Sequence, residues 1–269
     1  MTSDDNIGLS EPAKSVPLDP PAHLRPSVPV PFPLPLTKMI SGLPRASQKK
    51  NGVRMNGKRD PGLVKDSLFS VKRGDTLHVI SENYFYKTEP YYTILNHELA
   101  GKNVRPSSTD ILDAYIVPIC LERAKLAGIP VCDWEISQAY VPLPSIIYGL
   151  NYFATTSDFF EVSDAEHAKE VIKHVTNKGR YPFCYQRITE DATIHSCPAI
   201  FGKTNNACSV VAPIAEKIYE TFSMPLVRMI MVRTGNHYEL SSLSPMRYSQ
   251  LTDADRTLLS AYIAHQEFL

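Results

Sequence analysis

The chain has 269 residues, of which 43% are hydrophobic and 21% are charged. It therefore has enough apolar material for one large or two small hydrophobic cores. The 28 basic residues balance the 28 acidic residues, so the overall charge indicates neither a nucleic-acid partner nor an anionic membrane. No window approaches the ~18 consecutive apolar residues of a membrane-spanning helix, and the first twenty residues lack the pattern of a secretory signal. A cytoplasmic location without membrane association is therefore expected.

Residues 1–67 differ in composition from the rest of the chain. Eleven of the 22 prolines precede residue 62, and residues 21–65 hold nine basic side chains against one acid. Proline fixes φ and lacks a backbone N–H, so this segment is expected to be a disordered tail, Pro-rich at first and then basic, that populates polyproline II. It is either a solvated linker or an anchor whose basic cluster contacts RNA or an acidic protein surface.

Residues 68–143 predict an α/β domain. Thr76–Ile80 is a short β-rich apolar run, and Pro90 opens a segment whose apolar residues share one helical face until Gly101 ends it. Strands that alternate with helices of about ten residues favour a parallel sheet covered by helices. The other predicted elements are a strand near Val104, a helix over residues 118–127 and a strand over residues 129–132.

Residues 144–269 predict an antiparallel-rich α+β domain. Ser163 and Glu166 form a capping box for a helix over residues 164–177. Gly235-Asn236 predicts a hairpin turn, and Pro198 places its strand at an edge or a bulge. The remaining predicted elements are strands over 159–162, 181–188, 194–201, 226–232 and 237–240, a helix over 209–222, and a closing helix that starts at Thr252 with Asp255 at its third position.

The five cysteines are widely spaced and form no CxxC pair, which argues against a disulfide framework or a zinc site. They are expected to be reduced core residues. The sequence contains no GxxxxGK(S/T), GxGxxG, GxSxG or HExxH motif. His195 and Cys197 alternate on one predicted strand and are either a thiolate with its base or an uninvolved buried pair. No catalytic residue is assigned.

The richest polar run is NYFATTSD, residues 151–158, just before a predicted strand. Its hydroxyls and backbone N–H groups can hold a phosphate or a carboxylate, between apolar walls of aromatic residues. The run can equally be a self-capping turn. Its candidate ligand-binding residues are Asn151, Thr155, Thr156 and Ser157, and its aromatic neighbours are Tyr152, Phe153, Phe159 and Phe160.

The order of elements carries a resemblance to a known family. The run from His78 to Ser107, which contains Glu89-Pro90-Tyr91-Tyr92, resembles the RimK-like ATP-grasp N-terminal domain, and in particular short archaeal proteins of this kind. The resemblance implies an α/β plus α+β fold, in which a Rossmann-like pre-ATP-grasp domain is followed by a shortened ATP-grasp-like domain.

Two later segments extend the resemblance. Residues 181–188 (YPFCYQRI) look like the ATP-grasp strand that lines the adenine pocket, which makes Gln186 and Arg187 candidate contacts. Gln186 is otherwise a structural strand amide. Residues 212–245 resemble the final helix and hairpin of the family and end in LSSLSP.

The family joins a carboxylate to an amine with ATP and Mg²⁺, so the resemblance implies these cofactors. This sequence departs from the pattern, because Ser242 and Ser244 replace the metal-binding E-x-N pair and residues 227–232 contain no acid. Each lost electrostatic contact to a developing charge costs ~3–4 kcal/mol of barrier. ATP stays a candidate ligand, whereas the departure argues against Mg²⁺ binding and ordinary ligase turnover.

Three more residues are candidate ligand contacts: Lys203, Arg228 and Glu239. Lys203 and Arg228 can bind an anion through their positive charges. Glu239 is the only acid on the predicted hairpin. Lys203 and Glu239 can equally be solvated surface residues, and Arg228 can have a buried or interface carboxylate partner or be exposed.

Three functions are compatible with these patterns. The first is an ATP-grasp-related pseudoenzyme that binds a nucleotide, a peptide-like carboxylate or a macromolecular partner. The second is an active ATP-dependent carboxylate-amine ligase that takes its metal ligands from Asp158, Glu161, Asp191 or Glu239. The third is a non-enzymatic scaffold subunit that is anchored by its tail.

Overall fold

The computed structural model describes residues 62–264, with the exception of the side chains of residues 206 and 207. These residues belong to one compact unit, Gly57–Leu269. Most of the predicted tail, residues 1–61, lies outside the described residues, so its disorder and its role as an anchor stay predictions. Within residues 62–264, no helix is long and apolar enough to cross a membrane.

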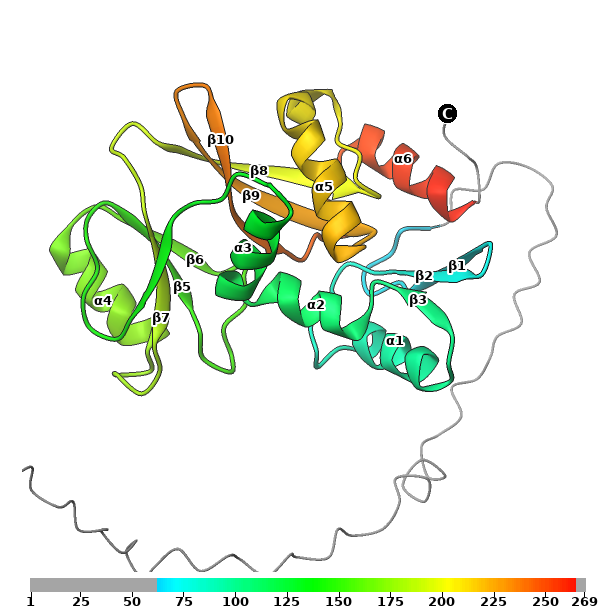
Figure 1. Cartoon of the computed structure of the whole chain (residues 1–269), viewed down its shortest axis with the longest axis horizontal. Coiled ribbons are helices and arrows are strands. Elements are labelled where there is room, and N and C mark those ends of the chain that lie inside the picture. The colour runs from blue at the N-terminus through cyan, green and yellow to red at the C-terminus, as the bar shows by residue number, and fades with distance from the viewer. Residues whose placement is uncertain (1–61, 265–269) are drawn as a thin grey trace, which may run out of the picture. The chain divides into compact units, whose positions relative to one another are not determined.

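The first sheet has three strands, near the start of the described chain (Figure 1). β1 (Phe69–Arg73) pairs antiparallel with β2 (Thr76–Ile80), and β2 pairs in parallel with β3 (Asn103–Arg105). A parallel pair needs a crossover connection, and α1 (Glu89–Leu99), with a proline in its first turn, lies in it. The predicted elements β2, α1 and β3 are confirmed, whereas the sequence patterns do not predict β1.

The predicted parallel sheet ends at β3. Residues 129–132, predicted as its next strand, form only an isolated bridge, in which Val131 lies beside Leu240. Leu240 N donates to Pro130 O at 2.8 Å, and Cys132 N donates to Leu240 O at 3.0 Å. The prediction is wrong because this segment pairs with a strand more than a hundred residues away along the chain, which local periodicity does not report.

Two helices, α2 (Ser108–Tyr115) and α3 (Val117–Leu126), follow the first sheet. α3 confirms the helix predicted over residues 118–127, but the sequence patterns do not predict α2. It begins after Ser107, whose side chain accepts a hydrogen bond from Asp110 N at 3.0 Å. Both helices pack against the last strand of the chain (Figure 1).

The second sheet has four antiparallel strands in the order β4-β7-β5-β6. They are β4 (Trp134–Ser137), β5 (Ser145–Gly149), β6 (Phe159–Val162) and β7 (Phe183–Arg187), and α4 (Ala165–Val175) packs on them (Figure 1). The predicted β6, α4 and β7 are confirmed. The predicted capping box is wrong by one residue, because Asp164 is the N-cap and its side chain accepts from His167 N at 2.8 Å.

The third sheet is antiparallel in the order β10-β9-β8. Its strands are β8 (Thr193–Ile200), β9 (Leu226–Thr234) and β10 (His237–Ser244), and the predicted turn joins the last two. Pro198 lies in β8, which is an edge strand as predicted. Helix α5 (Ala212–Phe222) precedes β9, and α6 (Asp253–Ile263) follows β10 with the predicted capping box of Thr252 and Asp255.

The main hydrophobic core contains residues from both predicted domains. Val79, Ile94 and Leu121 come from before residue 143, whereas Met229 and Leu243 come from after it. The predicted mixed α/β class is confirmed. The division into residues 68–143 and 144–269 stays a prediction.

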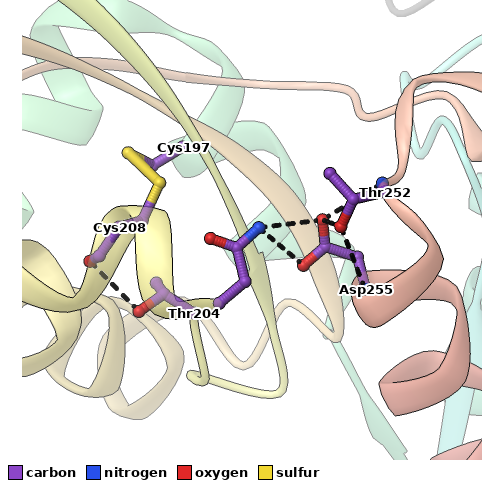
Figure 2. The surroundings of a disulfide bond; sticks show 6 residues. Cys197, Thr204, Cys208, Thr252 and Asp255 are labelled. Atoms are coloured by element: carbon purple, nitrogen blue, oxygen red, sulfur yellow. Dashed lines mark hydrogen bonds between the residues drawn. A yellow bond between two sulfur atoms is a disulfide. The ribbon is translucent and has the colours of Figure 1, made fainter.

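Cys197 and Cys208 form a disulfide, with their Cα atoms 5.9 Å apart (Figure 2). The expectation of five reduced cysteines is therefore wrong for this pair, and a bonded Cys197 cannot act as a thiolate beside His195. The loop after β8 brings the two residues together, and their spacing matches no motif. Three cysteines are free and buried as predicted, and burial raises the pKa of each thiol to about 12: Cys120, Cys132 and Cys184.

Removing the disulfide is expected to destabilise the fold, because the bond closes the loop between β8 and α5. Thr204 Oγ1 donates to Cys208 O at 3.2 Å within this loop (Figure 2), and Asn205 Nδ2 donates to Asp255 Oδ2 of α6 at 3.1 Å. For a loop of this size, the Cys197→Ser/Cys208→Ser variant should lose about 2–3 kcal/mol of unfolding free energy.

Urea denaturation without a reducing agent measures this loss. Wild-type protein in a thiol reductant should match the double variant. Equal stability of the variant and the oxidised wild type would contradict a stabilising disulfide.

Candidate functional site

A cleft of about 1040 Å³, which we call the main cleft, lies between segments that are far apart in the sequence. One wall comes from the segment before β1 and from the β2–α1 connection. A second comes from the β5–β6 connection, and a third comes from β9, α6 and the segment between β10 and α6. The contributing segments are residues 63–66, 81–90, 155–158 and 245–250, together with Arg228 and Arg256.

The second half of the predicted polar loop lines the main cleft. Thr155 Oγ1 donates to Asp158 Oδ2 at 3.0 Å, and Asp158 N donates to Thr155 O at 3.0 Å. Ser157 is exposed at the cleft surface. Thr156 is only 5% exposed, and its Oγ1 has no hydrogen-bond partner among the described residues. Because an unpaired buried hydroxyl is costly, Thr156 is the loop residue best suited to contact a ligand.

The first half of the loop does not line the main cleft. Asn151 Nδ2 donates to Val175 O at 2.8 Å, and its Oδ1 accepts from Phe153 N at 2.8 Å, so this residue holds a self-capping turn. Tyr152 and Phe153 are 57% and 76% exposed, and Lys87 Nζ lies 3.3 Å from the centroid of the Tyr152 ring. The expectation that these two rings form apolar walls is wrong, because both lie on the surface.

Three arginines from separate segments line the main cleft: Arg228, Arg247 and Arg256. The half-buried guanidinium of Arg228 donates to the side chain of Gln250. Burial, followed by the charge of Arg247, lowers the pKa of Arg228. In the described part of the chain, none of the three arginines has a carboxylate within 4.0 Å. An anion in the cleft would relieve the repulsion between Arg228 and Arg247.

Glu82 is one of the cleft residues that the sequence does not predict. It follows β2, is 7% exposed and lines the main cleft. Its Oε1 accepts from Tyr248 N at 2.5 Å and its Oε2 accepts from Asp66 N at 2.9 Å. One carboxylate therefore ties together two walls of the cleft. An acid two residues after a β-rich apolar run is a usable signal, because ligands bind at the carboxyl ends of strands in open α/β sheets.

Three of the other predicted residues lie outside the main cleft. Gln186 is fully buried; its Nε2 donates to Ser241 O at 2.7 Å and its Oε1 accepts from Ser241 Oγ at 2.6 Å, so the structure uses it as an internal amide. Lys203 forms a surface ion pair with Glu216 at 2.6 Å. Glu239 is exposed on β10, and partial burial, followed by the charge of Asp133, raises its pKa.

Arg187 lines a second cleft, of about 910 Å³, beside β4 and β7. Tyr185 OH donates to Glu135 Oε2 at 2.5 Å, and this bond raises the pKa of Tyr185 to about 12. Trp134 also lines the cleft, and its Nε1 donates to Glu122 Oε1 at 3.2 Å. This second cleft lies along the strand that the family resemblance assigns to adenine binding.

The residues at LSSLSP do not fit a magnesium ion. Ser242 and Ser244 are both 0% exposed and line neither cleft, so their hydroxyls are closed off from a hydrated ion. Among residues 62–264, no group of three or more His, Cys, Asp or Glu side chains could hold a metal. The four acids from which the ligase alternative would take its metal ligands come from separate elements: Asp158 lines the main cleft, Glu161 is on β6, Asp191 is in the β7–β8 connection, and Glu239 is on β10.

Residues 155–262 match the family model described as the RimK-like ATPgrasp N-terminal domain. The predicted family resemblance is therefore confirmed, although the match lies downstream of the run from His78 to Ser107 that first carried it. No curated protein matches the chain. The archaeal subgroup stays a prediction.

The chain is also similar to solved ATP-grasp structures. A RimK domain ATP-grasp protein from Sphaerobacter thermophilus is 13% identical, with a TM-score of 0.49 over 65% of this chain and 76% of that one. D-alanine-D-alanine ligase from Helicobacter pylori is 13% identical, with a TM-score of 0.48 over 65% of each chain, so less than two thirds of the ligase is covered. The ATP-grasp ligase PsnB, complexed with a precursor variant, Mg and ADP, is 13% identical, with a TM-score of 0.44 over 64% of each chain.

Proposed function

We propose that this chain, whose residues 155–262 match the RimK-like ATP-grasp N-terminal domain family, is a binding protein in which the ligase chemistry is lost or strongly altered. Its ligand is a peptide-like carboxylate or a phosphate, bound in the main cleft. The observation that carries the proposal is that Arg228, Arg247 and Arg256 line one cleft with the Thr156 hydroxyl, which has no hydrogen-bond partner in the described part of the chain.

The chemistry of these groups supports an anionic ligand. A guanidinium presents N–H donors in a planar fork that matches two oxygens of a carboxylate or phosphate. The Thr156 hydroxyl adds a neutral donor from the wall that the β5–β6 connection forms, where a ligand oxygen would supply the partner that it lacks among residues 62–264. Glu82 accepts from two backbone N–H groups and forms no ion pair with an arginine among residues 62–264.

ATP is the second ligand of the proposal, and the second cleft is its candidate place because it lies along β7. Loss of ligase turnover is supported by the burial of Ser242 and Ser244 at the family's metal-binding pattern. A cytoplasmic location, and a tail that contacts RNA or an acidic protein, are further proposals that rest on the sequence.

A thermal-shift experiment on the full chain tests the cleft. A dipeptide with a free carboxylate, or inorganic phosphate, should raise Tm by several degrees at a concentration of about 100 Kd, because binding to the native state contributes about 2.7 kcal/mol there. Arg228→Gln should weaken this binding about tenfold, which corresponds to about 1.4 kcal/mol. Lys203→Gln removes an exposed cation outside the cleft and is the matched control.

The same samples separate the alternatives. An equal loss of binding affinity in Arg228→Gln and Lys203→Gln, or no Tm shift with any of these anions, would contradict anion binding in the main cleft. ADP release from Mg-ATP that depends on an amine acceptor would restore the active ligase instead.

A further inference from the structure

A group of basic side chains lies on one face of the first sheet. His78 of β2 and Arg105 of β3 are direct partners in the parallel pairing. Arg73 of β1 is the partner of Thr76, two residues before His78. Side chains at paired positions, and at alternate positions of one strand, share a face of a sheet. Arg73, His78 and Arg105 therefore share one face, which we call the basic face.

An aromatic ring packs against the basic face and fixes two of its members. The Phe201 ring centroid lies 5.7 Å from the His78 ring centroid and 5.3 Å from Arg73 Cζ. Phe201 is itself packed between other rings, with Tyr219 at 5.7 Å and Tyr262 at 4.3 Å. Arg73 also donates to Tyr262 O at 3.1 Å. The guanidinium of Arg73 is therefore held in place, whereas the Arg105 side chain is exposed.

The basic face holds one unpaired nitrogen and two arginines without a carboxylate partner among residues 62–264. His78 is 8% exposed, and its Nδ1 is buried without a hydrogen-bond partner among residues 62–264. Within the described part of the chain, neither Arg73 nor Arg105 has a carboxylate within 4.0 Å. A buried unpaired nitrogen beside two unneutralised guanidiniums is a costly arrangement for a surface without a ligand.

Burial and both neighbouring arginines lower the pKa of His78. Burial, followed by Arg73 and then Arg105, lowers the pKa of His78 to about 4, so the imidazole is neutral at pH 7. The other titratable groups packed around Phe201 are Tyr219 and Tyr262. The two arginines also act on Tyr219, where they oppose the larger effect of burial, which raises its pKa.

We propose that the basic face is a phosphate-binding site. Arg105 and Arg73 contact the phosphate oxygens, and the N–H group of the neutral His78 imidazole donates to them from the sheet. Phosphate suits this site because its two negative charges offset both guanidiniums and its oxygens accept from planar N–H forks. The ligand is free inorganic phosphate or the phosphate group of a small ester. Neither Arg73, His78 nor Arg105 lines the main cleft, so this site is separate from the proposed function.

The experiment uses the full chain at low ionic strength with inorganic phosphate and, in a second arm, glycerol 3-phosphate. NMR of the His78 ring, assigned with a His78→Asn variant, reports on this site and not on the main cleft. Bound phosphate should raise the titration midpoint of His78 by at least about one pH unit, because a nearby anion favours the imidazolium.

Two variants make the test specific. Arg105→Gln should weaken phosphate binding about tenfold, so the His78 midpoint should shift much less at a phosphate concentration near the wild-type Kd. Arg105→Lys should weaken the binding less. Lys72→Gln removes a cation from the same sheet but from the opposite face of β1, and it should change binding less than about twofold.

A His78 midpoint that does not move at saturating phosphate would overturn the proposal, and so would equal weakening by Lys72→Gln and Arg105→Gln. Both remaining outcomes support it. Binding of inorganic phosphate alone identifies a free ion, whereas tighter binding of glycerol 3-phosphate identifies a phosphate ester.

Discussion

Glu82→Ala is expected to lower the free energy of unfolding by about 3–5 kcal/mol, because hydrogen bonds to a charged group contribute about 1.5–3 kcal/mol each. The substitution leaves Tyr248 N and Asp66 N without their acceptor, and the side chain is only 7% exposed. Glu82→Gln should lose about half as much, because its amide oxygen replaces one acceptor and its NH₂ group faces the other N–H donor. Urea denaturation with an unchanged slope measures both losses.

The control for this prediction is Glu89→Gln, since Glu89 lines the same cleft but is exposed. It should change stability by less than about 0.5 kcal/mol. Because Glu82 fixes the segment that carries Arg247, the Glu82 variants should also bind the cleft anion more weakly. A Glu82→Ala protein as stable as wild type would show that the two backbone contacts contribute little.

Sequence patterns predict those parts of the fold that depend on neighbours in the chain. The hairpin turn at Gly235-Asn236, the capping box of Thr252 and Asp255, and the helix that Pro90 opens all follow from residues within one turn of each other. Contacts between residues that are far apart in the sequence give no such local pattern. The bridge from Val131 to Leu240 depends on how distant segments meet, and the disulfide from Cys197 to Cys208 depends on the loop after β8, which returns beside that strand.

The same limit applies to the candidate site. Thr156 and Arg228 can be predicted as ligand-binding residues from their local surroundings, and the structure places both in the main cleft. Gln186 has a polar side chain on a strand, but its partner Ser241 lies 55 positions along the chain, so the sequence leaves its role open. Arg247 and Arg256 become cleft residues only because the chain after β10 folds back beside β9.

Restoring the family's metal-binding pattern should break the fold and should not rescue ligase activity. In Ser242→Glu/Ser244→Asn, a carboxylate and an amide replace hydroxyls that are 0% exposed on β10, paired with Ile230 and Arg228 of β9. An unpaired buried charge costs several kcal/mol, so we expect a loss of about 4 kcal/mol or more, or an unfolded protein. Ser242→Ala, which removes the hydroxyl and adds no charge, should stay within about 1 kcal/mol of wild type. Thermal unfolding of the three proteins, with and without Mg-ATP, measures these differences. A folded double variant whose Tm rises with Mg-ATP but not with ATP alone would show that the strand can still accept a metal ligand, and would contradict the proposed loss of the ligase site.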